Sequence, residues 1–455
     1  MITEKIIPGL IKMTIYALSS GPGISGVAVI RVSGEKTGEV IKKLTNSVLP
    51  QPRVATLKKF SKNGEKNLID EGVILWFPGP NSYTGEDLAE FHVHGSRAVV
   101  EAMHQAISKV KNCRLAEPGE FTKRAFQNGK INLLKAESIA DLISSETEIQ
   151  RKQAIKIMSG KSSNKFNTWR KKLLKVLSHV EAKIDFPDED LPKNIMKQIQ
   201  NVSQTVSSEI KETLNDQKVG ERIREGFKIA ILGPPNSGKS SLLNYLSKRN
   251  AAIVSEIAGT TRDVIETHLN LNGYPVIVSD TAGIRSSKNE IEKKGIKIAL
   301  KRADDADLKL IIIPAKSADL TSVFKSLLKN NAILVVNKSD LLKGKLNNKY
   351  KKYEHVLISI KKNSNLNKLI NLIKSKLKSK FVSSGDILIT RERHRQNLIS
   401  CVAHLEIFNK KKNAKDFDKA AEDLRLATRH LGMIVGKVGV EELLGSIFND
   451  FCIGK

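Results

Sequence analysis

The octapeptide GPPNSGKS, Gly233–Ser240, carries the residue types of a phosphate-binding loop. Gly233 and Gly238 let the backbone turn so that successive N–H groups face a chain of phosphates. Lys239 supplies a positive charge for the β- and γ-phosphates, and the Ser240 hydroxyl can ligate Mg²⁺. The apolar run FKIAIL precedes the loop and SLLNYLSK follows it, which is the strand–loop–helix context that the motif requires. The sequence therefore predicts a nucleoside triphosphate site.

Three further motifs follow in the order that a GTPase requires. AGTTRD, residues 258–263, is a plausible first switch, with a threonine hydroxyl for Mg²⁺. DTAG, Asp280–Gly283, ends a predicted strand, where a carboxylate can hold the Mg²⁺ shell and the Gly283 N–H can reach the γ-phosphate. NKSD, Asn337–Asp340, resembles the guanine-reading motif, because its aspartate accepts two hydrogen bonds that adenine cannot offer. Together these motifs resemble the translation-factor-class GTPases and predict GTP as the nucleotide.

Two positions depart from common GTPase patterns. Ser359-Ile360-Lys361 stands where such proteins carry Ser-Ala-Lys. Ile284 follows DTAG, where Ras-like enzymes carry a glutamine that orients water. Water must then be positioned otherwise. Glu292, on the predicted helix after the second switch, is either a catalytic carboxylate or an ordinary solvated helix charge.

Alternating strand and helix patterns position these motifs. Short apolar runs separated by helical stretches predict a mainly parallel sheet, and residues 221–380 are expected to form an α/β domain. Residues 13–127 mix β-branched runs, turn clusters and an amphipathic helix over 98–110, which predicts an α+β domain. Residues 128–220 and 381–455 have helical periodicity. The α/β domain is therefore expected to be inserted into a helical domain, with residues 1–12 as an N-terminal tail.

Composition restricts the class of protein. The 76 lysines and arginines exceed the 48 acidic residues, giving a net charge of +28. This charge is explained either by an RNA partner or by compositional drift toward lysine. The three cysteines, Cys113, Cys401 and Cys452, lack metal-ligand spacing and indicate a reducing compartment. No apolar run is long enough for a membrane span and residues 1–12 do not resemble a targeting segment, so we expect a cytoplasmic protein.

The motifs GPPNSGKS, SEIAGTTRD and DTAGIR, followed by IEKKGI, resemble the MnmE (TrmE) family of tRNA-modifying GTPases. The resemblance extends from about Met13 to Lys455. It includes SGPGISGVAVIRVSG and NSYTGEDLAEFHVHG in the first domain, and DLRLATRHLG and FCIGK near the end. It implies an N-terminal folate-binding and dimerisation domain, a helical domain and an inserted Ras-like P-loop GTPase domain.

The resemblance also implies how GTP is hydrolysed. K⁺ replaces an arginine finger inside a dimer of GTPase domains, with Asn236, Ser255, Ile257 and Thr260 as its ligands. Ser240 and Thr261 hold Mg²⁺, and Glu292 helps to position the attacking water. The implied nucleotide-contacting residues are Asn236, Ser237, Gly238, Lys239, Ser240, Ser241, Ser255, Glu256, Ile257, Ala258, Gly259, Thr260, Thr261, Asp280, Thr281, Ala282, Gly283, Asn337, Lys338, Asp340 and Ser359.

A second implied site binds 5,10-methylenetetrahydrofolate, with 5-formyltetrahydrofolate as an analogue. Arg31, Glu90, Lys130 and Lys455 are its implied residues. A glutamate can accept two hydrogen bonds from the pterin edge, and Arg or Lys can meet the folate carboxylates. Cys452 is either a catalytic thiol or a residue that shapes the site. The His92–His94 pair has no third ligand nearby in sequence, which favours a structural or pocket-lining role over metal binding.

The family resemblance implies partners as well. The chain is expected to form a homodimer and to join an FAD- and NADH-using protein of the MnmG (GidA) type in a heterotetramer, with no membrane partner. Together they would add a 5-carboxymethylaminomethyl-type group to wobble uridine U34 of certain tRNAs. The alternatives are a ribosome-assembly GTPase and a folate-dependent aminomethyl transferase with a vestigial nucleotide domain. No GXXG clamp in a KH-like context supports the first, and intact Lys239, Ser240, Asp280 and Asp340 argue against the second.

Overall fold

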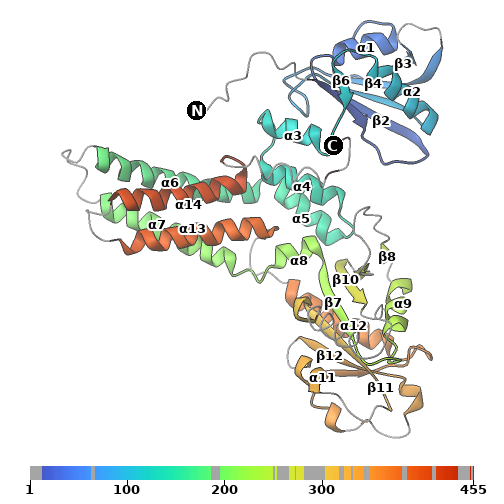
Figure 1. Cartoon of the computed structure of the whole chain (residues 1–455), viewed down its shortest axis with the longest axis vertical. Helices are drawn as coiled ribbons and strands as arrows, with labels where there is room; N and C mark the ends of the chain where they lie inside the picture. The colour runs from blue at the N-terminus through green and yellow to red at the C-terminus, as the bar shows by residue number, and fades with distance from the viewer. Residues whose placement is uncertain are drawn as a thin grey trace, which may run out of the picture. The chain divides into compact units, whose positions relative to one another are not determined.

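Figure 1 shows the chain as a computed structural model, which falls into two compact units. One unit contains residues 1–140 and 432–455, and the other contains residues 141–431. Each unit is described by itself. The residues that the structure describes are 13–62, 67–185, 195–249, 252–253, 266–271, 273–280, 303–316, 322–328, 331–342, 346, 348–381, 387–411, 417–438, 451 and 454.

The first unit is built on a six-stranded sheet with the order β3-β4-β5-β2-β1-β6. Its neighbouring strands pair antiparallel except for β1 and β6. Strand alternation sorts β5 into a buried face, with Phe91 and Val93, and a polar face with Glu90, His92 and His94. The elements are β1 (Thr14–Leu18), β2 (Ser25–Ser33), α1 (Thr37–Thr45), β3 (Thr56–Ser61), β4 (Leu68–Phe77), β5 (Leu88–Gly95), α2 (Arg97–Ser108), β6 (Cys113–Leu115) and α3 (Glu120–Gln127).

Helices α1 and α2 cover the apolar face of this sheet. Val40, Ile41 and Leu44 of α1 and Met103 and Ile107 of α2 join the strands in one buried cluster. The α+β prediction is confirmed in this unit, and α2 is the amphipathic helix expected over 98–110.

The second unit contains long helices, several of which lie side by side in Figure 1. The predicted helix before DFPDED ends at Asp185. The helical pattern between 131 and 158 is divided into two helices, because Thr147 and Gln150 form a capping box that starts the second. The helices from residue 133 onward are α4 (Leu133–Ile143), α5 (Glu148–Met158), α6 (Lys161–Asp185), α7 (Ile195–Leu214), α8 (Val219–Glu225), α13 (Glu392–Lys410) and α14 (Phe417–Val435). The boundaries between the two units fall within α4, after residue 140, and within α14, after residue 431.

The α/β region of this unit has a seven-stranded sheet with the order β13-β12-β11-β7-β10-β9-β8. The predicted mainly parallel sheet is confirmed, since β13, β12, β11, β7 and β10 run parallel. At one edge β9 pairs antiparallel with β10, and β8 pairs antiparallel with β9. The elements are β7 (Phe227–Leu232), α9 (Lys239–Arg249), β8 (Ala252–Ile253), β9 (Glu266–Leu271), β10 (Tyr274–Asp280), β11 (Leu308–Pro314), α11 (Ser322–Leu327), β12 (Ala332–Asn337), η1 (Ser339–Leu341), η2 (Asn348–Tyr350), β13 (His355–Leu357) and α12 (Leu366–Phe381).

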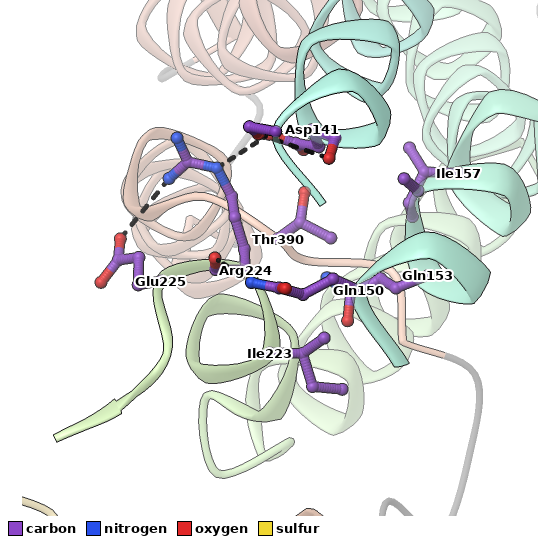
Figure 2. A pocket seen from close by; sticks show the side chains of 10 residues that line it. Asp141, Gln150, Gln153, Ile157, Ile223, Arg224, Glu225 and Thr390 are labelled. Atoms are coloured by element: carbon purple, nitrogen blue, oxygen red, sulfur yellow. Dashed lines mark hydrogen bonds and ion pairs between the residues drawn. The ribbon is translucent and has the colours of Figure 1, made fainter. Parts of the chain in front are cut away.

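The chain enters this α/β region through α8 and leaves it through residues 387–391. These two connecting segments, α8 and residues 387–391, are in contact, because a Cβ added to Gly220 would lie 1.9 Å from the Ile389 carbonyl oxygen. One carboxylate binds both: Asp141 Oδ1 accepts from Arg224 Nε at 3.0 Å and from Arg391 Nη2 at 2.7 Å. Figure 2 shows Asp141 and Arg224 beside a cavity of about 130 Å³.

Within the stretches of the chain that the structure describes, no helix is both long enough and apolar enough to span a bilayer.

Candidate functional site

The phosphate-binding loop lies between the carboxyl end of β7 and the start of α9. A Cβ on Gly233 would lie 2.2 Å from the Ile312 carbonyl oxygen. A Cβ on Gly238 would lie 2.2 Å from Asn337 Nδ2, and Gly238 has a φ of +103°. The loop can therefore adopt this conformation only with glycine at both positions. The same compact backbone brings its N–H groups together, where they can bind an anion.

Side chains of the loop suit a triphosphate with its metal. Lys239 Nζ donates to the carbonyl oxygens of Gly233 and Pro234 at 2.9 and 3.0 Å, so its charge is folded over the loop. Ser240 is exposed at the start of α9, where its hydroxyl is accessible to a Mg²⁺ ion. Ser237 is fully buried, and its Oγ has no hydrogen-bond partner among the described residues. A buried hydroxyl without a partner is unusual and suits a site that receives a ligand.

The NKSD motif is attached to the loop by two hydrogen bonds. Asn337 ends β12, is buried, and donates from Nδ2 to the Ser237 carbonyl oxygen at 2.8 Å. Lys338 Nζ donates to the Asn236 carbonyl oxygen at 2.8 Å. Sequence reasoning placed both residues near the nucleotide but missed this structural role. These hydrogen bonds thus link the part of the candidate site that would bind the base to the part that would bind the phosphates.

Asp340 is oriented by the segment after β13. The Ser359 hydroxyl donates to Asp340 Oδ1 and accepts from the Lys362 N–H at 3.1 Å. The Ser359 hydrogen bond is the main reason that the pKa of Asp340 lies below its usual value. The carboxylate is therefore held ionised, as an acceptor for N–H groups of a base.

Ile360, the residue that departs from Ser-Ala-Lys, has a definite place. Its N–H donates to Asn337 Oδ1 at 3.3 Å, and its side chain packs against the core of the α/β region. Its Cδ1 lies 3.5 Å from where a Cβ of Gly238 would be. The longer side chain is accommodated beside the loop while the backbone contact to Asn337 is made.

Several predicted residues lie outside the described residues of the chain. Asp280 ends β10 beside Ile231 of β7, but only its backbone is described. The others are Ser255, Glu256, Ile257, Ala258, Gly259, Thr260, Thr261, Thr281, Ala282, Gly283, Glu292, Cys452 and Lys455. Their predicted roles stay predictions.

A second polar cluster lies in the first unit, on the sheet face opposite α1 and α2. Arg31 and Glu90 stand directly opposite each other on β2 and β5. Arg31 Nε and Nη2 both donate to Glu90 Oε1, at 3.0 and 2.7 Å. The rings of Tyr83 and Phe121 each lie 5.7 Å from the Arg31 guanidinium carbon. Sequence reasoning missed both aromatic residues, although Tyr83 lies in NSYTGEDLAEFHVHG, a motif that carried the family resemblance.

The described residues of the chain's end meet this cluster. The Gly454 carbonyl oxygen accepts from Ser19 Oγ at 2.7 Å and from Arg31 Nη1 at 3.4 Å. Phe451 is buried against Leu133 and Ala136. The end of the chain is therefore packed at two points on either side of Cys452.

The remaining predicted residues of this unit have simpler surroundings. Lys130 is exposed, and its stem lies against Gly85. His94 Nδ1 lies 2.8 Å from Asp70 Oδ1, and His92 Nε2 lies 3.6 Å from Glu90 Oε2. Each histidine thus faces a different carboxylate. The two described cysteines have thiols that are hard to ionise, since burial raises the pKa to about 11 for Cys113 and to about 12 for Cys401.

Comparison with known proteins identifies the family. The family model of the MnmE helical domain matches residues 133–452, and that of the GTP-binding protein TrmE N-terminus matches residues 14–130. The chain is 73% identical over 443 residues to the tRNA modification GTPase MnmE of Pelagibacter ubique, covering 97% of this chain and 100% of the relative. The chain belongs to the MnmE family. It is a GTPase that acts in tRNA modification.

A more distant MnmE relative and a solved structure of another GTP-binding protein are also similar to the chain. The tRNA modification GTPase MnmE of Rickettsia bellii is 45% identical over 446 residues, covering 97% of this chain and 100% of the relative. Among solved structures, a variant of Aquifex aeolicus Era bound to GDP.AlF4- is 26% identical over 41% of this chain and 68% of that chain, with a TM-score of 0.26.

Proposed function

We propose that this chain is a K⁺-stimulated GTPase that works with an FAD- and NADH-using protein of the MnmG type. The pair would add a 5-carboxymethylaminomethyl-type group to wobble uridine U34 of certain tRNAs, with a methylene-tetrahydrofolate carbon. The observation that carries the GTPase half is the link between Asn337 and the Ser237 carbonyl, which holds a base-reading carboxylate and a phosphate loop together. Family membership carries the tRNA half.

The described residues fit GTP and its metals. Gly238 and Lys239 suit the phosphates, Ser240 suits Mg²⁺, and Asp340 suits the guanine edge. Asn236 lies exposed on the loop, where its side chain can reach a cation beside the phosphates. A bound cation there would supply positive charge where negative charge develops during hydrolysis. With Asn236, we propose Ser255, Ile257 and Thr260 for K⁺, Thr261 with Ser240 for Mg²⁺, and Glu292 for positioning water.

The Arg31 cluster fits one end of a folate, with altered roles for its members. Arg31 directs two of its donors to Glu90 Oε1, so we propose that it orients the glutamate instead of meeting the folate carboxylates. Glu90 would then accept from the pterin edge, and Lys130 and Lys455 would meet the carboxylates. Cys452 would act in the modification step. This site would lie in a homodimer.

An exchange of base preference tests the GTPase half. Asp340→Asn replaces an acceptor by an amide, which can donate to the carbonyl that xanthine carries in place of the guanine amino group. We expect GTP affinity to fall at least about 100-fold and XTP to be hydrolysed instead, because unpaired polar groups discriminate strongly. Asp305→Asn, an exposed aspartate of the same α/β region, is the matched control. Unchanged GTP affinity in Asp340→Asn would remove Asp340 from base reading.

Two further measurements test the K⁺ mechanism and the tRNA half. GTP turnover of the full chain in K⁺ should exceed that in Na⁺, and equal rates would rule out the K⁺ mechanism. Nucleoside analysis of tRNA from cells lacking this protein should show unmodified U34, restored by the wild-type chain. Normal modification of U34 in cells that lack this protein would refute the tRNA half of the proposal.

A further inference from the structure

Helix α12 carries lysines on its outer side and no acidic residue along its length. Lys368 and Lys378 are exposed and Lys374 is half-buried. We call these three residues the α12 lysine face. Lys362 adds a further exposed charge in the turn before the helix. At about 1.5 Å per residue, the face extends about 15 Å along the helix axis.

The core fixes which way this face points. Leu366, Leu369, Ile370, Ile373 and Leu377 of α12 are buried in the core of the α/β region. The opposite side then presents the lysines with Asn367, Asn371 and Ser375 among them, all exposed. Each of these side chains offers hydrogen-bond donors, and none carries negative charge. Such a surface is complementary to an anionic chain.

The lysines of this face lack the ion pairs that lysines make elsewhere. Lys368, Lys374 and Lys378 form no ion pair with any described residue, whereas between α6 and α7 a single glutamate binds two lysines. There Lys165 and Lys172 lie 2.8 and 3.2 Å from Glu209. Lys376 of the same helix lies 2.7 Å from Glu354, so α12 carries one paired lysine beside a face whose three lysines have no ion pair among the described residues. The unpaired charge therefore lies on the side of α12 that faces away from the core.

Helix stability does not explain all of these charges. Cations in the last turn of a helix are favourable, which accounts for Lys378 but not for Lys374. Lys362 and Lys368 lie at the N-terminal end of α12, where positive charge opposes the helix dipole and costs about 0.3–1 kcal/mol. The first turn of the helix contains no acidic residue to offset them. The charge at this end is thus kept against local stability.

We propose that the α12 lysine face binds the phosphodiester backbone of tRNA. The inference rests on the proposed tRNA substrate and adds where this chain contacts it. The ammonium groups would meet phosphates, while Asn and Ser donors between them would bond to phosphate or ribose oxygens. Contacts of this kind position an RNA without reading its sequence.

The test is the salt dependence of tRNA binding by the full chain. In Lys368→Gln/Lys374→Gln/Lys378→Gln, the slope of log K against log salt concentration should fall by about 2, since each lost phosphate contact removes about 0.7–0.9. The affinity at low salt should fall at least about tenfold. The matched control is Lys171→Gln/Lys175→Gln/Lys197→Gln, three exposed lysines of α6 and α7, which should keep the wild-type slope.

A charge-retaining variant guards against misfolding. The three Lys→Arg changes should keep the slope, and GTP turnover should equal that of wild type in all variants. An unchanged slope in the Lys→Gln variant would overturn the proposal, as would loss of affinity for the flavoprotein partner with tRNA binding intact. If the wild-type chain restores U34 modification but does not bind tRNA, the α12 lysine face fails while the proposed function stands.

Discussion

At the scale of single residues, the candidate nucleotide site depends on one close approach. Gly238 lies in the phosphate-binding loop and Asn337 at the end of β12, and a Cβ on the glycine would lie 2.2 Å from the asparagine amide. Gly238→Ala therefore must displace the hydrogen bond from Asn337 to Ser237 or the loop itself. We expect guanine nucleotide affinity to fall at least about 100-fold, because unfavourable φ and the clash each cost at least about 1–2 kcal/mol.

Gly273→Ala is the control for that experiment. Gly273 also has a positive φ, of +90°, but nothing lies within 4 Å of its added Cβ. It should lose about 1 kcal/mol of stability and bind fluorescent GDP as wild type does. If both variants bind equally well, the close approach of Gly238 to Asn337 is not needed for the site.

At the scale of elements, Asp141 links α8 to residues 387–391, the two segments that connect the α/β region to the helices. Its side chain and that of Arg391 are 17% and 14% exposed, so screening by water is limited. Asp141→Asn leaves two guanidinium groups without their shared anion, and we expect a loss of about 2 kcal/mol. Amide hydrogen exchange in α8 and at the start of α13 should accelerate.

Glu225→Gln is the matched change on the same arginine. Glu225 lies 3.6 Å from Arg224 and is 48% exposed, so its loss should change stability by less than about 0.5 kcal/mol. An unchanged rate of amide hydrogen exchange in Asp141→Asn would show that α8 and residues 387–391 are held together by the close packing at Gly220 instead.

The pairing of α6 with α7 makes a pH-dependent contribution. Glu209 accepts from Lys165, from Trp169 Nε1 at 2.7 Å and from Lys172, and these bonds lower its pKa to about 2. Because the folded pKa is depressed, the stabilisation is present above the unfolded value of about 4.3. It is lost as pH falls through about 2. Since the lysines are partly exposed, we expect about 1–2 kcal/mol.

Trp169 fluorescence can measure this contribution in a Trp76→Phe background, which leaves one tryptophan. In urea unfolding, Glu209→Gln should be less stable than its parent at pH 7, and the difference should shrink between pH 4.5 and pH 2. Glu212→Gln, an exposed position of the same helix, should show no such difference. A gap that stays constant with pH would assign the effect of Glu209 to packing.

The elements could largely be predicted from the sequence, and their pairing could not. Each strand of the parallel sheet is a short apolar run between helical patterns, so β7, β11 and β12 are visible locally. The carboxyl ends of parallel strands share an edge, which also brings the phosphate loop and NKSD together. The hydrogen bonds of Asn337 with Ser237 and of Asp141 with Arg391 join residues 100 and 250 positions apart. No local pattern specifies which partner such a side chain meets.

At the scale of the whole molecule, a residue near the end of the chain contacts residues near its beginning. The bond from Ser19 to Gly454 joins residues 435 positions apart within the first unit. Gly454 has a φ of +95°, and a Cβ there would lie 2.1 Å from the Leu18 carbonyl oxygen. Gly454→Ala should therefore displace the tail from Ser19 and Arg31. U34 modification should fall about 10- to 100-fold, since small misplacements have effects of that size, while GTP turnover stays at the wild-type rate.

Gly23→Ala controls for backbone strain, because Gly23 has a φ of +114° and nothing within 4 Å of an added Cβ. It should keep both activities. Folate binding to the two variants, measured by calorimetry with 5-formyltetrahydrofolate, then locates the defect. Weaker binding in Gly454→Ala alone would mean that the tail completes the Arg31–Glu90 cluster. Equal binding with lost modification would restrict the tail to a later step, and intact modification would show that the docked end has no role in the reaction.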